Sequence, residues 1–269
     1  MSADAVDGET AARTGTGSDG SYGPDDGILV LEDLTKRFGG LTAVDGLSFA
    51  VEREEILGFI GPNGAGKSTT FDCVIGTHPP TSGTVWYDGE DGTGVPAYEM
   101  VERGMARTFQ SFRPLRDRNV VENVKLGLIR NRLFSTAGLR RETYDRAVAL
   151  CERVGLGDQL EQTPDELPHA GMLRLELGRA LATDPGLLLI DEPFAGLSGV
   201  EVADVSKLFL TLREEGITLV VVDHNMRGLL ELIDRAIVIN FGSKIAEGTP
   251  AEIRRDPTVQ QAYLGGGGT

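Results

Sequence analysis

The sequence predicts an α/β fold in which helices cover both faces of a largely parallel sheet. Short apolar runs of strand length alternate with segments of helical spacing, a pattern typical of parallel sheets. One of these runs leads directly into a glycine-rich turn and then into a helical segment. A longer helical stretch between the strands indicates that a helical subdomain is inserted into the core.

The strands are predicted from apolar runs that turn residues bound on both sides. Four runs precede the helical stretch, at residues 28–31, 47–51, 56–60 and 84–87. Three more follow it, at residues 187–190, 219–222 and 236–239. We expect helices between these later strands, as parallel neighbours require.

The helical subdomain is predicted from apolar residues at three- and four-residue steps between residues 120 and 160. Within this stretch, one face of a helix is expected to collect Tyr144, Ala147, Val148, Cys151 and Val154. Another helix is predicted over residues 172–182.

The composition excludes several classes of protein. A formal charge of −15 argues against a surface that binds nucleic acid by neutralising many phosphates. No apolar run approaches the roughly 20 residues needed to cross a bilayer, and the sequence shows no secretory signal. A cytosolic protein is therefore expected. Cys73 and Cys151 lie far apart without a CxxC pair, so we expect both to be reduced core residues.

The N-terminal tail and the acid excess give two further expectations. Residues 1–27 are rich in Gly, Ser, Thr and Asp, lack apolar periodicity and are predicted to be disordered. Only five of the 26 basic residues are lysines. An acid-rich, lysine-poor surface suits a salt-rich cytoplasm, because salt screens the repulsion between like charges. We therefore hypothesise a salt-loving host.

The most specific motif follows the run at residues 56–60 and matches G-x-x-x-x-G-K-[ST]. Its glycines allow backbone N–H groups to wrap around phosphate oxygens, and the following helix adds its positive N-terminus. Lys67 is predicted to reach the β- and γ-phosphates, and the Ser68 hydroxyl to bind Mg²⁺. The alternative is an accidental glycine turn before a helix. The segment, here called the phosphate loop, comprises Gly61, Pro62, Asn63, Gly64, Ala65, Gly66, Lys67, Ser68 and Thr69.

A second motif is the buried run at residues 187–190, which ends in Asp191 and Glu192. This arrangement places both acids at the carboxyl edge of the sheet, where open α/β sheets bind their ligands. Asp191 is predicted to hold Mg²⁺, and Glu192 to orient or deprotonate an attacking water. The alternative is that the two acids merely begin the next loop.

Together these motifs resemble the ATPases of ABC transporters, and the resemblance covers nearly the whole chain after the tail. Residues 107–110, Arg-Thr-Phe-Gln, resemble the family's Q-loop, which implies that Gln110 contacts Mg²⁺ and takes part in catalysis. Residues 222–224, Val-Asp-His, resemble the switch-histidine strand end, which implies that His224 contacts the γ-phosphate. Without the resemblance, both side chains would be read as structural or surface residues.

The resemblance also implies where adenine binds. Phe38 lies where the family stacks an aromatic ring on the base, and Val44 follows in the same ATP-binding segment. An aromatic residue near the end of a strand is also often part of the core, so this assignment depends on the resemblance.

The fold implied is a P-loop NTPase (RecA-like) core with a mostly parallel sheet, an antiparallel β subdomain and the inserted helical subdomain. The expected ATPase domain covers residues 28–255, with the helical subdomain at about 115–182 and a C-terminal extension at 256–269. ATP and Mg²⁺ are the implied cofactors. The implied partners are membrane-spanning permease subunits, a sister ATPase subunit and, indirectly, an extracytoplasmic solute-binding protein. The implied location is peripheral, on the cytoplasmic face of the membrane.

Three finer segments are similar to the importer ATPases for branched-chain amino acids. They are residues 38–44, the Arg-Thr-Phe-Gln quartet, and residues 246–265 with Ala-Glu-Gly-Thr-Pro and Ala-Tyr-Leu-Gly. ATPases of urea and short-chain amide importers are closely related and remain an alternative. A further alternative is an ABC-type ATPase that acts on DNA or ribosomes without a membrane partner.

The chain departs from the family at the signature loop, usually LSGGQ, which completes the ATP site of the opposite subunit. The matching residues are Leu167, Pro168, His169, Ala170 and Gly171. Proline removes both the serine hydroxyl and an N–H donor. Ser198 also replaces the acid that often ends the D-loop. We therefore predict pairing with a sister ATPase that has an intact signature, or else a weak, regulatory ATPase.

Overall fold

A six-stranded sheet forms the centre of the computed structural model, which describes residues 22–108, 113–128, 137–223 and 225–264. Its strand order is β10-β9-β3-β8-β7-β6, and all neighbours pair in parallel except β9 and β10. The strands are β3 (Ile56–Ile60), β6 (Met105–Arg107), β7 (Leu187–Asp191), β8 (Thr218–Val222), β9 (Arg235–Asn240) and β10 (Ser243–Gly248). The central strands β3, β7 and β8 are buried along their whole length, which explains their continuous apolar sequences.

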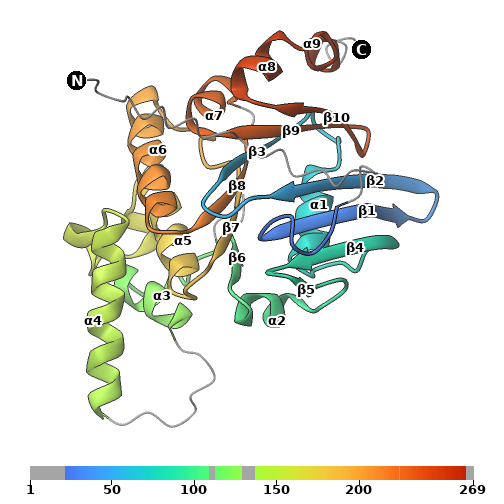
Figure 1. The fold of residues 1–269 in the computed structure, drawn as a ribbon. Helices are drawn as coiled ribbons and strands as arrows, with labels where there is room; N and C mark the ends of the chain where they lie inside the picture. The colour runs from blue at the N-terminus through green and yellow to red at the C-terminus, as the bar shows by residue number, and fades with distance from the viewer. Residues whose placement is uncertain (1–21, 109–112, 129–136, 224, 265–269) are drawn as a thin grey trace, which may run out of the picture.

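A second, antiparallel sheet lies on one side of the first (Figure 1). Its order is β2-β1-β4-β5, with β1 (Leu29–Phe38), β2 (Leu41–Val51), β4 (Ser82–Tyr87) and β5 (Glu90–Asp91). Helix α1 (Lys67–Val74) packs with both sheets in one hydrophobic cluster, in which the Phe59 ring contacts those of Phe49 and Phe71. This cluster holds the start of α1 against the core.

The other face of the six-stranded sheet is covered by helices (Figure 1). A group of helices, α3 (Val120–Gly127), α4 (Ala137–Arg153) and α5 (His169–Leu181), extends away from the sheet. The remaining helices are α2 (Ala97–Glu102), α6 (Gly199–Glu214), α7 (Met226–Leu232), α8 (Pro250–Arg255) and α9 (Pro257–Leu264). Among the residues described, no helix has both the length and the apolar character of a membrane span.

The α/β fold with a mainly parallel sheet, an antiparallel sheet and a helical insertion is confirmed. Cys73 and Cys151 are both free and buried, as predicted. The first two strands are longer than predicted, because β1 and β2 continue beyond the core as an exposed hairpin.

Two predictions about the helices are wrong in detail. Tyr144 is 39% exposed, whereas Ala147, Cys151 and Val154 are fully buried. The first turns of α4 project past α3 (Figure 1), and Tyr144, nearer the start of α4 than Ala147, is more exposed. The helix predicted to begin at residue 172 begins at His169 instead, directly after Pro168, which has an extended conformation.

Candidate active site

The phosphate loop connects the end of β3 to the start of α1, in the strand–loop–helix order that was predicted. Gly66 has φ +106°, and a Cβ there would lie 2.4 Å from the Ala43 carbonyl oxygen. A Cβ at Gly61 would lie 2.4 Å from the Ile239 carbonyl oxygen. Only glycine therefore fits at these two positions. The β9–β10 turn supports the loop from outside, because the Gly242 N–H donates to the Ala65 carbonyl over 2.9 Å.

Lys67 lies at the mouth of this loop. Its ammonium donates to the Gly61 carbonyl at 2.6 Å and to the Pro62 carbonyl at 3.0 Å, and the residue is buried. Burial lowers the pKa of Lys67, and the charges of Glu192 and Asp191 oppose this effect. A buried cation that two carbonyl dipoles and two acids surround is well placed to receive an anionic group.

Asp191 and Glu192 lie at the carboxyl end of β7, as the sequence predicted. Asp191 is buried, and burial raises its pKa, while a hydrogen bond and the charge of Arg107 lower it. Glu192 has φ +52°, which is rare for a residue with a side chain. Its N–H donates to the Val222 carbonyl at 2.7 Å. This contact ties the strained turn to the end of β8, as is common for functional sites.

Ser68 and Asp191 line the same cavity, of about 580 Å³, although they come from different elements. Other residues on its wall are Val101, Ala106, Arg107, Arg113, Glu176, Arg179, Ala180 and Thr183. The structure therefore brings together the hydroxyl and the carboxylate that were predicted to bind Mg²⁺.

Arg107 is a residue of this site to which the sequence analysis gave no role. Its guanidinium donates to Asp72 at 2.6 Å and to Asp191 at 3.1 Å, and lies 5.5 Å from the centre of the Phe71 ring. The sequence did hold one signal, because Arg107 ends a short strand and the next strand of the same sheet along the chain ends in two acids. That signal could be interpreted only once β6 was known to pair with β7.

The two residues expected near adenine differ in exposure. Phe38 ends β1, is 44% exposed and contacts the ring of His78 edge-to-face, with the Lys36 ammonium 4.9 Å from its centroid. Val44 is fully buried in the cluster beneath the antiparallel sheet, so its side chain is not exposed to a ligand in this structure.

Gln110 and His224 lie outside the described residues. Two residues near them in the sequence are described: Thr108 is buried, and Asp223 accepts hydrogen bonds from the N–H groups of Phe194 and Asn225 at 2.7 and 2.6 Å. The bond from Phe194 joins the loop after β7 to the loop after β8. The predicted roles of Gln110 and His224 remain predictions.

The signature segment lies at the start of α5. Leu167 is buried, whereas Pro168 and His169 are exposed. The His169 ring nitrogen Nε2 lies 2.9 Å from the carbonyl oxygen of Ala195, in the segment that resembles the D-loop. No residue from 167 to 171 lines the cavity with Ser68 and Asp191. The segment is therefore separate from the phosphate loop of its own chain.

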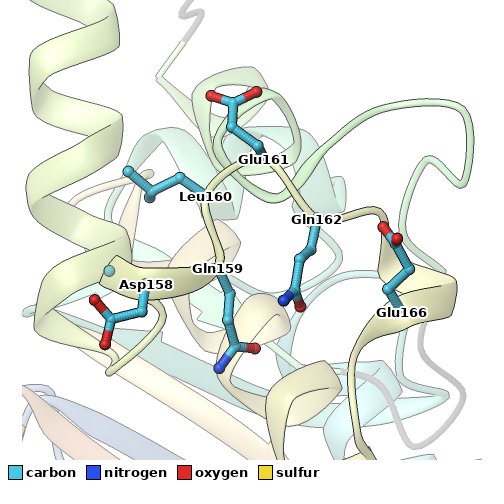
Figure 2. A pocket seen from close by; sticks show the side chains of 7 residues that line it. Asp158, Gln159, Leu160, Glu161, Gln162 and Glu166 are labelled. Atoms are coloured by element: carbon cyan, nitrogen blue, oxygen red, sulfur yellow. The ribbon is translucent and has the colours of Figure 1, made fainter.

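A second hollow, of about 430 Å³, lies in the helical subdomain and differs in character (Figure 2). Its wall carries the carboxylates of Asp158, Glu161 and Glu166 beside the amides of Gln159 and Gln162. Three carboxylates repel a polyphosphate, whereas the phosphate loop presents a lysine. This hollow therefore does not suit a polyphosphate, and residues 61–69 stay the predicted phosphate site.

Comparison with known proteins agrees with this geometry. The family model for ABC transporters matches residues 44–195, and the model described as branched-chain amino acid ATP-binding cassette transporter matches residues 243–269.

Curated relatives match over most of the chain. The high-affinity branched-chain amino acid transport ATP-binding protein BraF of Pseudomonas aeruginosa is 38% identical, covering 88% of this chain and 98% of its own. LivG of Escherichia coli, with the same description, is 37% identical with the same coverage. The lipopolysaccharide export system ATP-binding protein LptB of Escherichia coli is 35% identical, covering 88% of this chain and 97% of its own.

Solved structures agree as well. The ADP conformation of an ATP-binding cassette of an ABC transporter superposes with a TM-score of 0.81 at 30% identity, covering 88% of this chain and 98% of the other. A nucleotide-free cassette superposes with a TM-score of 0.80 at 31% identity and the same coverage.

Proposed function

Because the chain belongs to the ABC transporter family of ATP-binding subunits, we propose that it hydrolyses Mg·ATP to power an importer of branched-chain amino acids. The observation that carries the nucleotide part is the convergence of Lys67, Ser68 and Asp191 beside the phosphate loop. Relatives described as branched-chain amino acid transport ATP-binding proteins, together with the family match over residues 243–269, support the substrate.

The donor groups fit the proposed magnesium ion. A serine hydroxyl and a carboxylate on one cavity wall are oxygen ligands, which Mg²⁺ prefers. When bound, the ion neutralises charge on the transferring phosphate. Ser68 and Asp191 would hold it, with Gln110 as a third ligand implied by the family resemblance.

The remaining roles follow from position. Lys67 exchanges its two backbone carbonyl partners for phosphate oxygens, which are better partners for an ammonium. Glu192 orients the attacking water and accepts its proton, and the bond from its N–H to Val222 fixes the backbone from which it acts. Phe38, half-exposed at the end of β1, offers a ring face to adenine.

The proposed assembly is a head-to-tail pair with a sister ATPase, bound to permease subunits at the cytoplasmic face of the membrane. Two similar solved structures, at 25% and 26% identity, are described as dimeric cassettes. The exposed position of Pro168 and His169, away from this chain's own cavity, suits a segment that faces another subunit.

The substrate is tested by uptake. Cells that lack this chain should lose most import of labelled leucine, and wild-type protein but not Lys67→Ala should restore it. Unchanged leucine uptake in cells that lack the chain would exclude the proposed substrate. Uptake of labelled urea and acetamide in the same cells tests the amide-importer alternative.

A second candidate is lipopolysaccharide export, since LptB is 35% identical over a similar length. The higher identity to BraF and the family match at residues 243–269 favour amino-acid import. Intact leucine uptake together with a defective outer envelope would favour export instead.

A further inference from the structure

The buried guanidinium of Arg107 lies between two carboxylates from different parts of the chain. It contacts Asp191 at the end of β7 and Asp72 on α1, and its side chain is only 7% exposed. The Asp191 side chain is 8% exposed, whereas that of Asp72 is 29% exposed. Arg107 therefore shares its charge between a buried acid and a more accessible one.

The buried acid needs such a partner. A carboxylate removed from water is costly unless a cation and hydrogen bonds compensate it. Lys67 is the other cation near Asp191, but its ammonium is hydrogen-bonded to two loop carbonyls. On the same cavity wall, Arg179 pairs with Glu176 at 2.6 Å. Among the described ion pairs, Arg107 is thus the cation that contacts Asp191 directly.

Asp72 gives the guanidinium a second place to bind. It lies on α1, one residue after Phe71, whose ring is 5.5 Å from the guanidinium carbon. The Asp72 contact at 2.6 Å is shorter than the Asp191 contact at 3.1 Å. The aromatic ring and Asp72 together retain Arg107 even when its bond to Asp191 is lost.

We propose that Arg107 is an exchangeable counter-ion for the metal-binding acid. Without metal it neutralises Asp191, and when Mg²⁺ arrives with the nucleotide it yields Asp191 and keeps Asp72. Because β6 ends at Arg107, metal arrival changes the contacts of this strand end. The inference rests on the proposed assignment of Asp191 to Mg²⁺. Arg107 is accordingly a positioning residue that acts through Asp191.

The test measures how strongly metal and nucleotide binding are coupled. The affinity for the non-hydrolysable analogue AMP-PNP is measured by calorimetry with Mg²⁺ and with EDTA. The affinity with Mg²⁺ divided by the affinity with EDTA is then compared between variants. Arg107→Met removes the competitor, so the ratio should rise on the order of ten-fold. Asp72→Asn removes the second carboxylate to which Arg107 binds, so Arg107 should hold Asp191 more tightly against Mg²⁺ and the ratio should fall several-fold.

Controls separate this effect from a loss of stability. Arg53→Met removes an exposed pair with Asp88, remote from the phosphate loop, and should leave the ratio unchanged. In EDTA, Arg107→Met should unfold at a lower temperature than wild type, and Mg·AMP-PNP should restore more of its stability. If Arg107→Met is too unstable for calorimetry, the comparison of wild type with Asp72→Asn tests the counter-ion role by itself.

The outcomes distinguish the two proposals. Equal ratios in wild type and Asp72→Asn, or shifts of the same sign in both variants, would overturn the counter-ion role. A wild-type protein whose AMP-PNP affinity is independent of Mg²⁺ would instead contradict the proposed metal site.

Discussion

At the scale of single residues, Glu192 combines a strained backbone with a chemically useful position. Its φ of +52° costs on the order of 1–3 kcal/mol for a residue with a side chain. The hydrogen bond to Val222 holds that conformation. A retained strained residue at the end of a buried strand is typical of a functional turn.

Glu192→Gln should reduce ATP turnover at least about 100-fold, because an amide cannot accept the proton of the attacking water. ATP binding should persist, because the phosphate loop and Asp191 are unchanged. Turnover with the partner subunits and equilibrium ATP binding measure the two effects. Glu214→Gln, at the exposed end of α6, is the matched control and should be silent. Normal turnover by Glu192→Gln would refute the assigned role.

The residues that were predictable from sequence are those whose chemistry is local. Lys67 and Ser68 follow from the spacing of one short segment, and Asp191 from the end of one apolar run. Arg107 was missed as a site residue because its partner Asp191 is 84 positions away, brought near only when β6 pairs with β7. Tyr144 was placed wrongly because helical periodicity does not reveal where the neighbouring helices end.

At the scale of elements, Tyr87 links the two sheets. Its hydroxyl donates to the Gly104 carbonyl at 2.8 Å, and the same carbonyl accepts the Gly186 N–H at 2.8 Å. The link joins β4 to the loops that precede β6 and β7. Burial raises the pKa of Tyr87 from 10.0 to about 12.

This raised pKa predicts an alkaline loss of stability. The folded state holds the phenol proton more tightly than the unfolded state, so the contribution is complete below pH 10.0 and declines toward about pH 12. Tyr87→Phe should cost about 1 kcal/mol at neutral pH and flatten this decline. Urea unfolding from pH 8 upward provides the measurement. Tyr144→Phe, at an exposed position on α4, is the control, and an equal alkaline slope in wild type and Tyr87→Phe would contradict the argument.

At the scale of the whole molecule, the acid excess and the altered signature segment set the expected behaviour. The chain carries a net charge of −15, so its folded surface repels itself in dilute buffer. The unusual residues Pro168 and His169 lie on the surface, where a second subunit can reach them.

The charge predicts stabilisation by salt. Added potassium chloride should raise the thermal unfolding midpoint, by on the order of 3 °C for each 1 kcal/mol of relieved repulsion. Calorimetric scans at increasing salt, compared with sucrose of equal osmolality, separate screening from general solute effects. A midpoint that falls with salt would count against a salt-loving host.

The signature segment predicts dependence on a sister ATPase. Loss of charged hydrogen bonds worth roughly 1.5–3 kcal/mol should make this chain, alone with its permease subunits, at least ten-fold slower than the mixed pair. Replacing residues 168–170 with Ser-Gly-Gly should recover much of that rate. Full ATPase turnover by the unmodified chain without a sister subunit would rule out the requirement.

The contact between the β9–β10 turn and the phosphate loop bears on the order of events during synthesis. The loop leaves the ribosome early, but Gly242, which donates to Ala65 and accepts from the Asp45 N–H, follows about 180 residues later. Strand β3 likewise waits for β8 and β9, its neighbours on either side. A nascent chain therefore holds an unsupported loop until translation is nearly finished, and ATP can assist its folding only at the last stage.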